Sequence, residues 1–375
     1  DIDVSRYLAS SPRGDDGGSR DGAHHRASHW RAWISHRVRW ILAPRRRRAR
    51  DMSNYPTSTQ RNFWLYESRD AAREARARTR EGTLKTAAGA RAESSTSSVE
   101  TDALTLEEET QILRYHEHKI QSICAAFSLP RKVKNTAVML FKRFALAHGV
   151  AAHSLKIIML TSIYVACKVE ESYISADEFC KGVREDPARV LAAEVTFLSG
   201  LKFQLVCYGA TRPLEGFLRD VEDGACKVTA KQLVECRKTA LELIDSLMLT
   251  DVPLVRPPGQ IALCALRRAA RGANADDLAR YCESVGSRGT TPAPKGSALK
   301  DILDEIESHV EEGVEPEEAV VKEIDKKLKL FRSKYKAPAA ADDAGESKKG
   351  GRESKRRKSE QSHENMIAAE EDALG

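Results

Sequence analysis

Two charged residues stand in helical segments that are otherwise apolar, and they are the first candidates for a function. Lys168 is the only charge in residues 157–169, a run that is apolar almost all the way round, as in a helix at the centre of a bundle. Glu194 lies at the edge of an apolar stripe in a later segment. That stripe consists of Leu191, Val195, Leu198 and Leu201. A lone lysine and a lone glutamate on core helices are expected to pair with each other or to be reserved for a partner.

Each charge also has a simpler explanation when it is taken alone. Lys168 is close to the C-terminal end of its segment, where the helix dipole stabilises a cation by roughly 0.3–1 kcal/mol. Glu194 could be a solvated residue at the edge of its helix.

No catalytic chemistry of its own is visible in the chain. The sequence contains no GxxxxGK[ST], HExxH or GxSxG motif. His116 and His118 are two positions apart and point to different sides of a helix, so a solvated or partly buried pair is favoured over a metal site. The eight cysteines stand singly without a CxxC motif, which is typical of reduced core residues. We therefore expect a protein that is not an enzyme, with no catalytic residue, metal or cofactor.

The net positive charge of the chain comes from its first 51 residues. The 375 residues carry a net charge of +6, and residues 1–51 hold 12 arginines against 6 aspartates. We expect residues 1–51 to be non-native or disordered, with Met52 as the natural start. The alternatives are an Arg-rich transit segment, which the six aspartates disfavour, and a basic arm that binds nucleic acid. No apolar run approaches the roughly 20 residues that a membrane span requires.

The pattern of apolar residues predicts an all-α protein with two similar halves. We expect an N-terminal helix at residues 70–80 and a Ser/Thr-rich linker within residues 52–104, and a first five-helix bundle in residues 105–206. A second bundle in residues 207–312, a C-terminal helix in residues 313–335 and a disordered tail in residues 336–375 follow.

Helix boundaries follow from capping residues and proline breaks. The first bundle is predicted to contain helices at 106–127, from Pro130 onward, at 157–169, from a capping box at Ser175, and from Asp186 with Pro187 at its first position. The second is predicted at residues 213–221, 229–249, 258–270, 274–285 and 297–310.

This arrangement resembles the cyclin family. The matching stretches are PRKVKNTAVMLFKRFAL, LTSIYVACKVEE and VLAAEVTFLSGLKFQL, and they carry a lysine near the end of the third helix and a glutamate in the fifth. Within that family, the segments QRNFW, TRPLEGFLRD and CRKTALELIDSLMLTDVPLVRPPGQIALCAL are similar to the cyclin H group. The resemblance runs from Gln60 to about Tyr335, and it implies two tandem cyclin-box bundles.

The resemblance also implies a function and a partner surface. Lys168 and Glu194 fall on the paired positions at the kinase-facing surface of cyclins, with Val169, Leu198 and Phe203 as apolar neighbours. It implies a regulatory subunit that binds and allosterically activates a CDK-activating kinase. The further implied partners are a MAT1-type assembly factor and TFIIH. The implied substrates are activation loops of cyclin-dependent kinases and the C-terminal repeat of RNA polymerase II.

Some features of the family are absent and some alternatives stay open. The first helix reads ILRYHEHKIQSIC and lacks the MRAIL-type patch, so recruitment of substrates by a short linear motif is not expected. Another transcriptional cyclin, such as cyclin C, is the nearest alternative. A TFIIB-like nucleic-acid-binding protein and a pure scaffold are the others. Residues 106–310 hold 27 basic against 26 acidic groups, so we expect no direct binding of nucleic acid.

A short basic cluster in the tail predicts the location of the protein. Lys355, Arg356, Arg357 and Lys358 follow one another in a polar setting, and such a run is either solvated charge or a nuclear import signal. Together with the resemblance, it predicts a nuclear protein.

Overall fold

The computed structural model describes residues 55–89, 96–285 and 299–335. Every regular element in these residues is a helix, which confirms the predicted all-α class. The leader at residues 1–51, the tail at residues 336–375 and the basic cluster from Lys355 to Lys358 lie outside the described residues.

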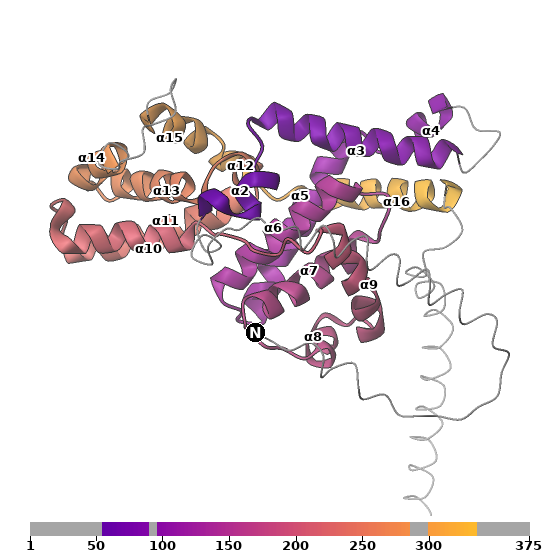
Figure 1. Cartoon of the computed structure of the whole chain (residues 1–375), viewed down its shortest axis with the longest axis horizontal. Coiled ribbons are helices and arrows are strands. Elements are labelled where there is room, and N and C mark those ends of the chain that lie inside the picture. Colours follow the sequence, from indigo (N-terminus) through magenta and orange to yellow (C-terminus); the bar gives the residue numbers. More distant parts are fainter. Residues whose placement is uncertain (1–54, 90–95, 286–298, 336–375) are drawn as a thin grey trace, which may run out of the picture. The chain divides into compact units, whose positions relative to one another are not determined.

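The first bundle is built around the apolar helix that contains Lys168 (Figure 1). Its helices are α5 Leu106–Ala126, α6 Arg131–His148, α7 Leu155–Val169, α8 Ala176–Val183 and α9 Pro187–Gly200. Helix α7 packs against α5, α6 and α9. Its residues from Ile157 to Cys167 are all buried, as the apolar run predicts. The central position of α7 fixes its last turn, which carries Lys168, against its neighbours.

The second bundle repeats this plan (Figure 1). Its helices are α10 Thr211–Asp220, α11 Ala230–Met248, the short α12 Val252–Val255, α13 Pro258–Gly272, α14 Asp276–Ser284 and α15 Leu299–Ser308. Helix α13 packs against α10, α11, α14 and α15. It is the counterpart of α7, as its small and apolar residues predict.

Several helices begin where their capping residues predict. The Asp186 side chain accepts a hydrogen bond from the Ala188 N–H at 2.9 Å, and Pro187 occupies the first position of α9. Ser175 accepts from the Glu178 N–H at the start of α8. Thr229 forms a complete capping box at the start of α11. These caps fix where α8 and α9 enter the bundle.

Three further helices, α3 Arg69–Gly89, α4 Thr96–Asp102 and α16 Glu318–Tyr335, pack together beside the first bundle, and the short α2 Thr59–Phe63 precedes them. Helix α3 packs on α6, and α16 packs on α5. The predicted N-terminal helix ended too early, because α3 continues to Gly89 and α4 lies within the predicted linker. A second, small apolar core explains the extra length, and it comprises Leu84, Ala87, Val99, Ala103, Phe331 and Tyr335.

The remaining elements are single turns. They are η3 Tyr55–Thr57, η4 Val221–Ala225 and η6 Val310–Gly313. Among the described residues, no helix has the length and apolar character that crossing a membrane requires.

Candidate functional site

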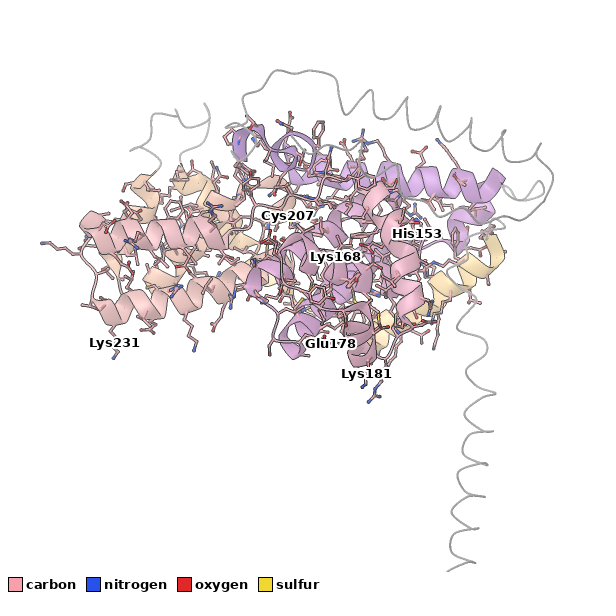
Figure 2. All side chains as sticks on the ribbon, turned by 60° about the horizontal axis from the view of Figure 1, so that its bottom comes forward. His153, Lys168, Glu178, Lys181, Cys207 and Lys231 are labelled. Atoms are coloured by element: carbon pink, nitrogen blue, oxygen red, sulfur yellow. The ribbon has the colours of Figure 1, made fainter. Side chains whose placement is uncertain are left out.

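Lys168 and Glu194 form an ion pair on the surface of the first bundle. Lys168 lies in the last turn of α7 and Glu194 lies in the third turn of α9, and these two helices pack together. The Lys168 Nζ donates to Glu194 Oε1 at 2.6 Å. In Figure 2, Lys168 lies in the same part of the molecule as Glu178 and Lys181 of α8, far from Lys231 of α11. The predicted pairing of the two residues is therefore present.

The pair is open to solvent on the lysine side. The Lys168 side chain is 48% exposed and that of Glu194 is 17% exposed. Partial burial acts to lower the pKa of Lys168, but the hydrogen bond and charge of Glu194 outweigh it and raise the pKa. The ammonium also lies 4.4 Å from the centre of the Tyr164 ring. Lys168 is thus a fixed cation held in place by a carboxylate and an aromatic ring.

Of the four residues in the predicted apolar stripe of α9, only Leu201 is fully buried, which corrects the sequence prediction. Leu191 and Val195 are 43% and 70% exposed, and Leu198 is half-buried. The face that enters the core consists of Val190, Ala193, Phe197 and Leu201. Because both sets follow helical spacing, the apolar pattern alone could not decide which of them packs inward. Leu191, Val195 and Leu198 share one face of α9 with Glu194, so the ion pair lies beside exposed apolar side chains.

The other predicted neighbours of the pair differ in exposure. Val169 is half-buried and packs against the main core, whereas Phe203 is 64% exposed. Two further exposed side chains were not predicted. Tyr173 is 94% exposed in the segment between α7 and α8, and Val206 is 54% exposed in the segment after α9. Only their unusual exposure marks them, and the sequence carries no signal of that.

The end of α9 is fixed by a close approach of its backbone to α6. A Cβ at Gly200 would lie 2.5 Å from His148 Nε2 and 2.6 Å from Phe144 Cε2. Such distances are too short for any residue larger than glycine without movement of α6 or α9. This contact sets the position from which the chain enters the segment that carries Phe203.

The fully buried charges lie elsewhere, and sequence reasoning missed them. Lys142 of α6 donates to Glu117 of α5 at 2.6 Å, and both side chains are about 5% exposed. Arg143 and Arg267 have no exposed surface at all. The Lys168–Glu194 pair therefore differs from the Lys142–Glu117 pair in being open to solvent, since the core has its own charges.

The two histidines do not form a metal site. The His116 ring nitrogen Nδ1 lies 2.8 Å from Ile112 O, and the ring stacks on Phe141. His118 bonds the Gly313 carbonyl at 2.9 Å. Burial lowers the pKa of His116, which favours the neutral ring. The described residues contain no group of three or more histidine, cysteine, aspartate or glutamate side chains that could hold a metal ion.

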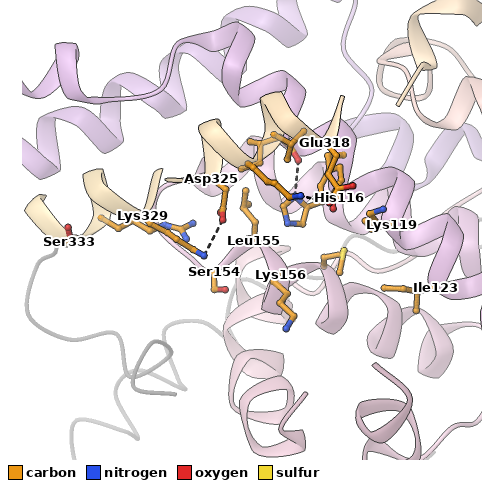
Figure 3. A pocket seen from close by; sticks show the side chains of 16 residues that line it. His116, Lys119, Ile123, Ser154, Leu155, Lys156, Glu318, Asp325, Lys329 and Ser333 are labelled. Atoms are coloured by element: carbon orange, nitrogen blue, oxygen red, sulfur yellow. Dashed lines mark hydrogen bonds and ion pairs between the residues drawn. The ribbon is translucent and has the colours of Figure 1, made fainter. Parts of the chain in front are cut away.

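A pocket of about 590 Å³ lies between α5, the start of α7 and α16 (Figure 3). Its charged lining is already partnered: Lys329 lies 3.1 Å from Asp325, and Lys156 lies 2.7 Å from Glu185. Lys156 is twelve residues before Lys168 on α7, or about 18 Å along the helix. The pocket is therefore separate from the surface around the ion pair.

Comparison with known proteins gives the family. Residues 94–206 match the Cyclin, N-terminal domain family, and residues 210–311 match the Cyclin C-terminal domain family. Cyclin-H1-1 of Arabidopsis thaliana is 39% identical over 228 residues, which are 60% of this chain and 68% of the relative. Cyclin-H of Xenopus laevis is 33% identical over 242 residues, which are 62% of this chain and 73% of the relative.

Solved structures agree with this assignment. A chain of the CAK complex of Chaetomium thermophilum aligns over 76% of this chain and 90% of that chain, with a TM-score of 0.63. Its 21% identity shows the fold alone. A chain of the yeast TFIIK complex aligns over 68% of this chain and 100% of that chain, with a TM-score of 0.55 and 27% identity. With both cyclin domains matched and two cyclin H relatives covered over more than two thirds of their length, the chain belongs to the cyclin H family.

Proposed function

We propose that this chain is a regulatory cyclin that binds a cyclin-dependent kinase and activates it without catalysing a reaction itself. The observation that carries the proposal is the exposed surface around Lys168 and Glu194. There, an ion pair stands on the same face of α9 as the exposed Leu191 and Val195. Exposed apolar side chains around a fixed charge are typical of a surface that a partner covers.

The proposed mechanism is allosteric. A protein kinase is active when the glutamate of its C-helix pairs with the lysine that holds the ATP phosphates. A partner that holds this helix inward shifts the kinase to its active state without contacting ATP. In the proposed complex, Lys168 and Glu194 hold backbone groups beside the C-helix, and Val169, Leu198 and Phe203 contribute apolar contacts.

The relatives support a particular assembly. The yeast TFIIK complex consists of Kin28, Ccl1 and Tfb3. Cyclin CCL1 of Saccharomyces cerevisiae is itself 34% identical to this chain over 164 residues. We infer that this chain takes the cyclin position in a CDK-activating kinase, together with a kinase and a MAT1-type assembly factor, as part of TFIIH.

The same proposal includes substrates and a location. The activated kinase would phosphorylate activation loops of other cyclin-dependent kinases and the C-terminal repeat of RNA polymerase II. Transcription takes place in the nucleus, and we propose that the cluster Lys355, Arg356, Arg357 and Lys358 serves as the nuclear import signal.

The comparisons favour this proposal over a cyclin C-like function. Cyclin-C1-1 of Arabidopsis thaliana is 24% identical over 169 residues, against 39% for Cyclin-H1-1 of the same plant. The even charge balance of residues 106–310 also gives no support to a nucleic-acid-binding function.

The proposal is tested by substituting each member of the ion pair in turn. The full chain is mixed with the candidate kinase, and phosphorylation of a polymerase repeat peptide is measured for wild type, Lys168→Ala and Glu194→Ala. Removing one member of a pair that the partner desolvates costs about 3–5 kcal/mol. We therefore expect roughly a hundredfold or greater loss of kinase affinity, with the helical circular-dichroism signal retained.

Lys156→Ala is the control, because Lys156 lies on the same helix and is 56% exposed in a 2.7 Å ion pair with Glu185. We expect it to bind and activate the kinase like wild type. An equal loss for Lys156→Ala and Lys168→Ala would contradict the assignment of the surface. A folded wild-type protein that neither binds nor stimulates the kinase would contradict the function.

A further inference from the structure

The segment that carries Phe203 has no regular structure of its own. This hinge loop, residues 201–210, joins α9 to α10. Lys202 and Phe203 both have left-handed backbone conformations, with φ of 54° and 55°. Such values are uncommon for residues other than glycine and persist only where surrounding contacts enforce them. The position of the exposed Phe203 therefore depends on what holds the hinge loop.

One contact comes from inside the first bundle. Arg143 of α6 is fully buried, and its Nη1 lies 3.3 Å from both the Gln204 and Val206 carbonyl oxygens, to which it donates. The guanidinium carbon of Arg143 lies 5.6 Å from the centre of the Trp64 ring. A buried arginine that donates to loop carbonyls fixes the inner side of the hinge loop.

The other contacts come from the N-terminal strap, residues 55–66. The buried Gln60 pairs with the backbone of Tyr208 in both directions: the Tyr208 N–H donates to Gln60 Oε1 at 2.7 Å, and Gln60 Nε2 donates to the Tyr208 carbonyl at 3.3 Å. The Trp64 indole N–H donates to Gln204 Oε1 at 2.7 Å. The strap is also tied to the second bundle, because the Tyr66 N–H donates to Leu254 O on α12 at 2.8 Å.

We propose that the N-terminal strap is a positioning element of the kinase-binding surface, a role that rests on the proposed function. Gln60 and Trp64 clamp the hinge loop from outside while Arg143 holds it from inside. Together they keep Phe203 in the arrangement that the kinase contacts. A loop released from the strap would have to be ordered when the kinase binds, and the entropy lost in that step would weaken binding.

Hydrogen exchange of the free chain tests the clamp without any kinase. The Phe203 N–H donates to Leu198 O and the Gln204 N–H donates to Leu201 O, so both amides report on the fold of the hinge loop. In Gln60→Ala we expect these two amides to exchange about tenfold faster than in wild type. Asn62→Ala is the control, since Asn62 lies on α2 and its side chain bonds only Thr57 O within the strap. Unchanged exchange in Gln60→Ala would overturn the proposal.

A double-mutant cycle tests whether the strap acts through Phe203. Gln60→Ala should weaken kinase binding about tenfold, or about 1.4 kcal/mol, while Asn62→Ala leaves it unchanged. In a Phe203→Ala background the effect of Gln60→Ala should fall below twofold, because there is no longer an aromatic ring to position. If Phe203→Ala binds too weakly to measure, Phe203→Leu serves as the background.

Failure of the positioning role of the strap can be told apart from failure of the proposed function. Losses that add independently would mean that the strap itself contacts the kinase, and the positioning role would be wrong. A wild-type chain that does not bind the kinase would remove the proposed function, and hydrogen exchange would still decide whether the strap orders the hinge loop.

Discussion

Adjacent glutamates at the start of α5 are expected to affect stability in opposite directions as the pH changes. Glu109 is only 6% exposed, and the nearest cation, Arg80 Nε, is 3.7 Å from its carboxylate. That Nε is engaged with the Leu104 carbonyl at 2.9 Å. Burial therefore dominates over the charges of Arg80 and Arg76 and raises the pKa of Glu109 to about 7.

The sign of the effect follows from linkage. A carboxyl group whose pKa is higher in the folded state than its unfolded value of 4.5 favours folding when it is protonated. Its contribution is complete below pH 4.5 and is lost as the pH rises toward 7 and beyond. A difference of about 2.5 pKa units corresponds to about 3 kcal/mol. Glu109→Gln should therefore be more stable than wild type at pH 8 by up to about 3 kcal/mol, and nearly equal to it at about pH 4.

Glu108 is the matched control, one residue away. Burial acts to raise its pKa, but hydrogen bonds from Lys327 and from the Thr105 N–H outweigh it and hold the pKa below its usual value. Glu108 thus stabilises the fold above its unfolded pKa, and this contribution is lost as the pH falls. Glu108→Gln should be less stable than wild type at neutral pH.

The assay is urea unfolding followed by circular dichroism at several pH values between about 4 and 8. The difference between Glu109→Gln and wild type should grow with pH. A constant difference, or one that grows toward acid, would refute the reasoning that links burial of Glu109 to its pKa.

Three further predictions concern the packing of the first bundle and its surface. Gly200→Ala should lower the free energy of unfolding by about 1–3 kcal/mol in urea titration, because the added Cβ would overlap His148 and Phe144. Gly216→Ala in α10 is the control, and it should be neutral or slightly stabilising because there is open space around Gly216. Lys142→Met should lower the free energy of unfolding by about 3–5 kcal/mol, because it leaves Glu117 buried without a cation. Adding Glu117→Leu should recover most of this loss, and failure to recover it would contradict the ion-pair explanation. In the free chain, Lys168→Ala should change the unfolding free energy by less than about 1 kcal/mol, because the lysine is half exposed, and a larger loss would show that the pair is structural.

The fold was largely predictable because its signals are local. Asp186 followed by Pro187 marks the start of α9, and Thr229 marks the start of α11, as the structure has them. The length of α3 was not predictable in this way. Residues beyond Arg80 become helical because Leu84 packs against residues such as Phe331, which is far away in the sequence.

The candidate site was predictable only in part. The pairing of Lys168 with Glu194 followed from the family pattern, and the structure places the two side chains in contact. Which face of α9 is exposed did not follow, because Leu191 and Val195 are as apolar as the residues that are buried. The contacts that fix the hinge loop could not be predicted from the sequence either. Gln60 and Tyr208 are 148 residues apart in the chain, and no local pattern indicates that they form a hydrogen bond.

The small core shared by α3, α4 and α16 has a consequence for how the protein is made. The Tyr335 hydroxyl donates to Asp102 at 2.5 Å across a separation of 233 residues. At a synthesis rate of 5–20 residues per second, a ribosome needs roughly 10–50 seconds to add that length. During this interval Leu84 and Val99 have emerged without Phe331 and Tyr335, the residues that later cover them. We therefore expect α3 and α4 of the newborn chain to be a part that chaperones bind, until α16 closes over them.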